Sequence, residues 1–143
     1  MKMNKEYVDF AVAKELKEKG FPQKKEDALA MYNEDGCFLS LCTKDEEYYL
    51  FEDFDEYDCV CPTYEQVMNW IREEKGIHIY CYIGKDWDTD ADGEVIGGWN
   101  YWAFCIMDMS GEGIDDDWID TLEYDSYEKA CEGGIKYCLE KLI

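Results

Sequence analysis

One stretch of the chain, residues 62–84, constrains the fold more than any other. Thr63 and Gln66 have the spacing of a capping box, and Pro62 disfavours helix in the residue before it, so a helix is predicted from Tyr64. Its apolar residues share one face, and they are Val67, Met68, Trp70 and Ile71. Gly76 supplies the left-handed residue that commonly ends a helix.

A strand is predicted directly after this helix. From residue 77 the apolar period becomes two, which is the period of a strand. One side then has Ile77, Ile79, Cys81 and Ile83, and the other has His78, Tyr80 and Tyr82. If Trp70 anchors the helix against this strand, its replacement by alanine should cost about 3–5 kcal/mol of stability.

The chain is predicted to be a single acidic domain spanning residues 1–143. A chain of this size buries roughly 70% of the surface that it exposes when unfolded, so a sizeable core can form. The hydrophobic content of 47% supplies that core, and the formal net charge of −21 must therefore lie on the surface.

Two further helices and several strands are predicted from the same periodicities. The helices span residues 4–19 and 127–142, and Asp125 with Glu128 is predicted to cap the second one. The predicted strands span 28–32, 37–41, 48–51 and 99–109, with a loop at 85–98 and a short strand or irregular segment at 118–124.

These elements predict an α+β fold. Its antiparallel sheet should have about four to six strands, with the central and C-terminal helices packed on one face. Gly133 and Gly134 lie inside the last predicted helix and weaken it by about 1 kcal/mol each relative to alanine. That cost suggests close packing of this helix against the sheet.

The acidic charge disfavours several classes of partner. A net charge of −21 repels nucleic acid and anionic membranes, because both require a cationic surface. The N-terminus lacks the apolar region of a signal peptide, and no apolar run reaches the roughly 18 residues of a membrane span. We therefore predict a cytoplasmic protein with no membrane contact and no direct contact to nucleic acid.

No set of residues forms a recognisable catalytic or cofactor motif. The eight cysteines contain no CxxC pair, so most are interpreted as small reduced core residues, with disulfides or a metal site as alternatives. His78 alternates with isoleucines, which favours a half-buried structural side chain over a general base. GxSxG, P-loop and GxGxxG patterns are absent, so we predict a non-enzymatic protein without a cofactor.

Two segments resemble a group of small uncharacterised proteins. They are PTYEQVMNWIREEKGIHI at residues 62–79 and YEKACEGGIKYCL at residues 127–139. Both are similar to sequences encoded by gut Bacteroidetes and by their phages and mobile elements. The resemblance implies a bacterial or phage setting, and it transfers no activity or catalytic residue, because both segments are scaffold.

The sharpest local motif is DWDTDADGE, residues 86–94. Asp88, Asp90 and Asp92, with the glycine after them, match the first half of a calcium-binding loop, in which alternating carboxylates converge on the ion. The twelfth position of such a loop needs a bidentate glutamate and is Trp99 here. One hypothesis is therefore a weak Ca²⁺ site at these aspartates, and the alternative is a solvated hairpin connection.

Two acidic stretches that contain aromatic residues form the predicted interaction surface. Their residues are Asp53, Asp55, Glu56 and Asp58, and Asp115, Asp116, Asp117 and Trp118. Such a face aids solubility and can also attract a basic protein partner. We predict a protein-interaction module of bacterial or phage origin that binds such a partner. The alternatives are a DNA mimic that inhibits a nucleic-acid-binding host defence enzyme, and the weak calcium-binding module.

Overall fold

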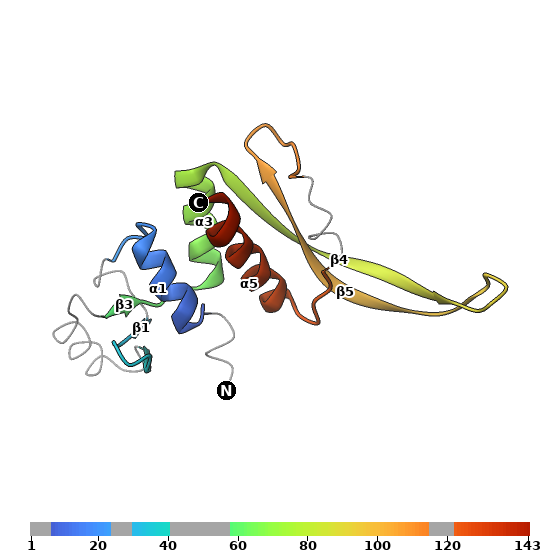
Figure 1. Ribbon diagram of the computed structural model, residues 1–143, viewed down its shortest axis with the longest axis horizontal. Helices are drawn as coiled ribbons and strands as arrows, with labels where there is room; N and C mark the ends of the chain where they lie inside the picture. Colours follow the sequence, from blue (N-terminus) through green and yellow to red (C-terminus); the bar gives the residue numbers. More distant parts are fainter. Residues whose placement is uncertain (1–6, 24–29, 41–57, 115–121) are drawn as a thin grey trace.

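The computed structural model describes residues 7–23, 30–40, 58–114 and 122–143 (Figure 1). In these ranges the chain has an α+β fold. Its elements follow in the order α1 (Phe10–Glu18), β1 (Ala30–Tyr32), β2 (Phe38–Ser40), β3 (Cys59–Val60), α3 (Tyr64–Lys75), β4 (Ile77–Thr89), β5 (Val95–Asp108), α5 (Tyr127–Tyr137) and the π-helical turn η3 (Cys138–Leu142).

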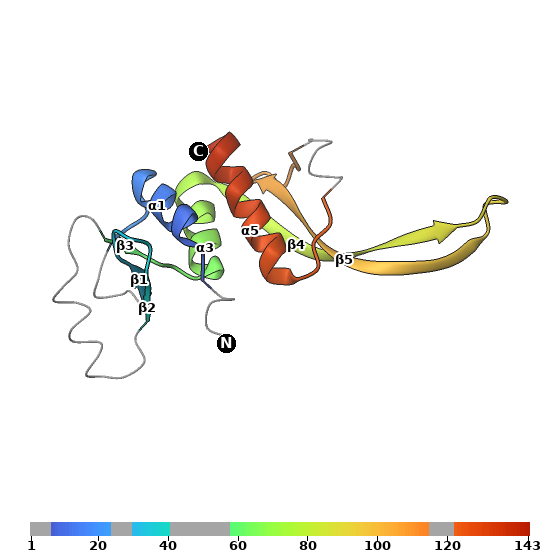
Figure 2. The ribbon, with the colours of Figure 1, turned by 60° about the horizontal axis from the view of Figure 1, so that its bottom comes forward.

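The described strands form two separate antiparallel sheets. One has the order β2-β1-β3, and in the other β4 pairs with β5. The predicted single sheet of about four to six strands is not confirmed, because Figures 1 and 2 place the helices between the two sheets. The predicted strand at 48–51 and residues 118–121 lie outside the described residues.

The central helix has the predicted bounds. Thr63 Oγ1 accepts a hydrogen bond from the Gln66 amide at 3.2 Å, and Gln66 Oε1 accepts one from the Thr63 amide at 2.9 Å. Gly76 ends the helix with a φ of 68°. Trp70 is half-buried and packs edge-on against Phe21, with ring centroids 5.3 Å apart. The residues of this helix that are fully buried are Val67 and Ile71, whereas Trp70 packs at the margin of the core.

The other two helices differ from prediction at their ends. α1 begins at Phe10, not at residue 4, because the Asp9 side chain caps it by accepting from the Val12 amide at 2.9 Å. The residue that caps α5 is Ser126, not Asp125, whose carboxylate instead pairs with the Lys129 ammonium at 3.0 Å. The α-helical geometry of this last helix ends at Tyr137, and η3 continues it from Cys138 to Leu142.

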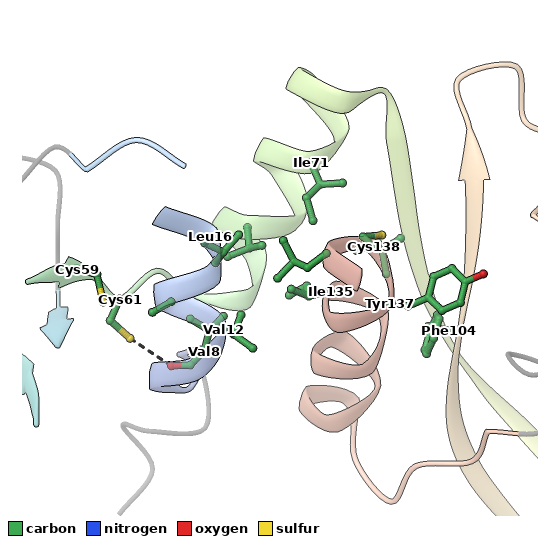
Figure 3. Packing of buried hydrophobic residues seen from close by; sticks show 14 of the residues in the cluster. Val8, Val12, Leu16, Cys59, Cys61, Ile71, Phe104, Ile135, Tyr137 and Cys138 are labelled. Atoms are coloured by element: carbon green, nitrogen blue, oxygen red, sulfur yellow. Dashed lines mark hydrogen bonds between the residues drawn. The ribbon is translucent and has the colours of Figure 1, made fainter. Parts of the chain in front are cut away.

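A single core cluster joins both sheets and all three α-helices (Figure 3). α5 approaches the hairpin so closely that a Cβ added at Gly134 would lie 2.6 Å from Cγ2 of Ile79. The close packing predicted from Gly133 and Gly134 is therefore confirmed. Phe104 lies beneath this contact, is 2% exposed, and faces Tyr137 with ring centroids 6.4 Å apart.

Candidate functional site

The distal part of the β4–β5 hairpin projects away from the helices (Figures 1 and 2). We call residues 82–101 the arm. Strand pairing continues without interruption from Ile77 opposite Asp108 to Asp88 opposite Gly97, where the register shifts. Every residue from 85 to 100 is exposed. The prediction of a loop at 85–98 is therefore wrong, because most of these residues belong to the paired strands β4 and β5.

Cross-strand contacts between aromatic rings and glycines explain how this segment forms a ribbon. Gly84 lies opposite Tyr101, and a Cβ added at Gly84 would collide with the tyrosine ring. On the other face Gly98 lies opposite Trp87, and a Cβ added there would lie 2.9 Å from a ring carbon of Trp87. The rings cover backbone that glycine leaves bare, which stabilises a ribbon of two strands.

The hairpin turn uses the side chain of Asp90. Its Oδ1 accepts hydrogen bonds from the amides of Asp92 at 2.9 Å and Glu94 at 3.0 Å. The Asp90 amide donates to the carbonyl of Glu94 at 2.9 Å, and Gly93 has a φ of 82°. The motif that resembles a calcium loop thus contains a tight turn that the carboxylate of Asp90 closes.

The same turn occurs at two other places in the described chain. Asp108 Oδ1 accepts from the amides of Ser110 at 2.9 Å and Glu112 at 3.2 Å. Asn33 Oδ1 accepts from the amides of Asp35 at 3.0 Å and Cys37 at 2.9 Å. Each copy has a glycine of positive φ at its fourth position. Neither copy has the calcium-loop pattern, so the turn geometry accounts for Asp90 without an ion.

Within the described ranges, no three His, Cys, Asp or Glu side chains lie close enough together to hold a metal ion. Asp88 and Asp92 are exposed, and one oxygen of Asp90 is engaged by the turn. Calcium binding at these three aspartates stays a prediction.

We expect Asp90→Ala to accelerate hydrogen exchange of the Asp92 and Glu94 amides about tenfold, since each loses its acceptor. Exchange measured by NMR tests this. Asp90→Asn keeps the acceptor oxygen and should exchange at the native rate. If Ca²⁺ raises the melting temperature of the native protein but not of Asp90→Asn, and EDTA reverses the rise, the carboxylate has a second role as a ligand. Native exchange rates in Asp90→Ala would contradict the turn assignment.

Both faces of the hairpin expose large apolar side chains. Ile83 and Trp87 lie on the face that α5 covers nearer the base, and they are 61% and 54% exposed. On the opposite face Tyr80 is 51% exposed and Trp99 is 48% exposed. Tyr80 also stacks with Tyr82, with ring centroids 6.3 Å apart. Exposed aromatic side chains in this number are typical of binding surfaces.

The arm is also acidic. Its charged residues are Lys85, Asp86, Asp88, Asp90, Asp92 and Glu94, which give it a net charge of −4. The lysine ammonium lies over the Trp87 ring at 4.4 Å from its centroid. Asp86 and Asp88 alternate along β4 on the face opposite the one that α5 covers. Apolar and anionic groups are therefore interleaved along one ribbon.

Most of the predicted interaction residues lie outside the described residues. These are Asp53, Asp55, Glu56, Asp115, Asp116, Asp117 and Trp118. Asp58 is described, and its predicted place on an acidic surface needs correction, since it is only 7% exposed. Its carbonyl accepts a hydrogen bond from the Lys17 ammonium at 2.6 Å, which ties this segment to α1.

The described cysteines are mostly packed in the interior, as the sequence predicts. Burial raises the pKa of the Cys61 thiol to about 12, and burial does the same to the pKa of Cys138. Both thiols are therefore protonated at neutral pH. Cys81 of β4 and Cys131 of α5 meet with their sulfurs 3.6 Å apart, and Cys37 is exposed. His78 is half-buried and stands beside Tyr80.

A shallow groove lies between the N-terminal ends of α3 and α5. It has a volume of about 310 Å³ and is lined by Thr63, Tyr64, Glu65, Met68, Tyr127 and Glu128. The Tyr64 hydroxyl lies 3.5 Å from Oε2 of Glu132 beside it. Both helices begin with a capping residue, a tyrosine and a glutamate. Similar residues therefore line the groove from its two sides. The groove has no cationic side chain among its lining residues.

Comparison with known proteins gives no match to a family model, to a curated protein or to a solved structure. The resemblance to gut Bacteroidetes and phage proteins therefore stays a prediction. In the part of the chain that is described, no helix combines the length and the apolar character needed to cross a membrane.

Proposed function

We propose that this protein is a non-enzymatic interaction module whose arm binds a basic protein partner in the bacterial cytoplasm. The observation that supports the proposal is the arm itself, a projecting ribbon with exposed Ile83, Trp87 and Trp99 and a net charge of −4. We therefore assign the proposed interaction surface to residues 82–101, whereas the acidic stretches that the sequence favours lie, except for Asp58, outside the described residues.

The energetics of the ribbon favour a binding role. A two-stranded hairpin alone is at best marginally stable in water. Exposed tryptophan and isoleucine side chains do not stabilise the monomer, and such exposed apolar area is typical of interaction sites. Burial of a large apolar side chain is worth about 1.5–3 kcal/mol, so covering Trp87 and Trp99 would contribute strongly to an interface.

The charge of the arm selects the class of partner. Its five carboxylates outnumber its single lysine, so the arm attracts a cationic surface and speeds the encounter with it. A second copy of this chain would bring the same negative charge to the interface, and so would a nucleic acid. A basic protein fits the surface best.

The double variant Trp87→Ser/Trp99→Ser is expected to lose a basic protein that the native chain captures from a bacterial lysate. Met109→Ser is the matched control, because Met109 is 70% exposed but lies outside the arm. Capture by the native chain should weaken between low and high salt, as expected for opposite charges. Equal capture by both variants would contradict the proposal.

DNA mimicry stays an alternative prediction, and it rests on the acidic stretches at 53–58 and 115–118, which lie, except for Asp58, outside the described residues. It predicts that the protein displaces DNA from a host enzyme in a salt-dependent way. Among the described residues, no spacing of carboxylates favours it over a basic protein partner.

A further inference from the structure

We propose that the partner supplies an extended segment that adds to the outer edge of β4 as a third strand. This inference rests on the proposed function of the arm and specifies how the arm binds. It starts from the hydrogen-bonding direction of each residue in the hairpin, because an unpaired strand edge is a template for another strand.

The contacts of β5 fix these directions. The Trp102 amide donates to the Tyr124 carbonyl at 2.7 Å, and the Tyr124 amide donates to the Trp102 carbonyl at 2.8 Å. Both backbone groups of Trp102 therefore point away from β4. The Ile106 carbonyl also points outward, where it accepts from the Ile114 amide at 2.7 Å. Trp102 lies opposite Ile83, so this is a non-hydrogen-bonded pair of the ladder.

The same alternation identifies the free groups of β4. Because the backbone N–H and C=O of Trp102 point away from β4, those of Ile83 point away from β5. The backbone groups of Cys81 and Lys85, two residues to either side, point in the same outward direction. Among the described residues, no backbone hydrogen bond to these outward groups occurs. Further along, the Trp87 amide donates to Oδ1 of Asp86 at 2.9 Å, which closes the edge toward the turn. The open edge is therefore the segment 81–85.

The two faces beside this edge define the side chains of the added strand. On the face shared with α5, the open edge has the exposed Ile83, and the exposed Trp87 lies on the same face just beyond its end. On the opposite face, the open edge itself has Tyr82 and Gly84, and the carboxylates of Asp86 and Asp88 follow directly beyond it toward the turn. Successive side chains of a strand point to opposite faces, so the best-matched segment alternates apolar and basic residues. A second copy of this chain would instead bring another arm of net charge −4 to this edge.

The probe is an acetylated and amidated octapeptide of alternating valine and lysine with a fluorescent label. In a strand all valine amides point to one edge and all lysine amides to the other. Two isomers are therefore compared, one N-methylated at every valine and one at every lysine. We expect the native protein to bind the unmethylated peptide and one isomer, and to bind the other isomer at least about tenfold more weakly. Fluorescence anisotropy measures all three affinities.

The identity of the weakened isomer reports the direction of the added strand. We take the valine side chains to lie on the face of Ile83. An antiparallel added strand then directs its valine amides toward β4, so methylation at valine weakens binding. A parallel added strand directs its lysine amides toward β4, so methylation at lysine weakens binding. Methylation adds the same bulk to both isomers and leaves their charge unchanged, so the difference between them isolates the edge contact. Equal affinity of the two isomers, or no binding of the unmethylated peptide, would overturn strand addition.

The variant Ile83→Pro tests the same edge by a change in the protein instead of in the peptide. Proline removes the outward amide of residue 83 and leaves the ladder bonds between β4 and β5 intact. We expect it to bind the peptide at least about tenfold more weakly than Ile83→Ala, which loses the same side chain but keeps the amide. An unchanged far-ultraviolet circular dichroism spectrum confirms the fold of both. Equal binding by the two variants would overturn the inference.

Failure of this inference is distinguishable from failure of the proposed function. If the methylated isomers bind equally but Trp87→Ser/Trp99→Ser still abolishes capture from lysate, the partner binds the faces of the arm and strand addition is wrong. If the tryptophan variants leave capture unchanged, the arm is not the binding surface, and the proposed function itself is wrong.

Discussion

Phe104→Ala is expected to lower the free energy of unfolding by about 3–5 kcal/mol, through lost transfer energy and the cavity left behind. The Phe104 ring is 2% exposed and lies between α5 and the hairpin, near both Tyr124 and Tyr137. A small domain has only about 5–15 kcal/mol of stability, so this loss is a large fraction of the total. Urea unfolding followed by circular dichroism measures it.

Tyr80→Ala is the control for this prediction. Tyr80 belongs to the same hairpin, but it lies on the opposite face and is 51% exposed. Its truncation should change stability by no more than about 0.5 kcal/mol. Similar losses in both variants would mean that the hairpin has no preferred buried face, which contradicts the packing of α5.

Gly134→Val is expected to destabilise the protein by about 3 kcal/mol, at the upper end of the cost of overpacking a core. The reason is steric, because even a Cβ at Gly134 would lie 2.6 Å from Ile79. Helix propensity predicts the opposite sign, since valine is a better helix former than glycine by a few tenths of a kcal/mol. The melting temperature and the urea midpoint should therefore both fall.

Gly97→Val is the matched substitution on the arm. A Cβ at Gly97 meets nothing within 4 Å. Valine also favours strand geometry, so this variant should be neutral or slightly more stable. If Gly134→Val were as stable as the native protein, α5 could not lie as close to β4 as described.

Local chemistry accounts for the elements that the sequence predicts well. Thr63, Gln66 and Gly76 specify both ends of α3, because caps are satisfied within a few residues. The hairpin of β1 and β2 follows in the same way from the turn at Asn33. Close packing at Gly134 is also predictable, since a glycine that weakens a helix needs a compensating contact.

The arm is not predictable by the same reasoning, because it depends on contacts between strands. Asp86, Gly97 and Gly98 are typical of loops when each is judged alone. Their strand conformation comes from partners across the ribbon, such as Trp87 over Gly98. The turn at Asp90 was available as a sequence signal, since its pattern recurs at Asn33 and Asp108.

The length of the arm does not depend on the packing of the core. Core contacts end near the base of the hairpin, whereas residues 85–100 are exposed throughout. Deleting the two facing pairs Lys85/Asn100 and Asp86/Trp99 would shorten the ribbon by one full pleat and keep every remaining side chain on its own face. The length of this protein's extension is therefore free to vary in steps of two residues per strand, with no repacking of the helices that hold it.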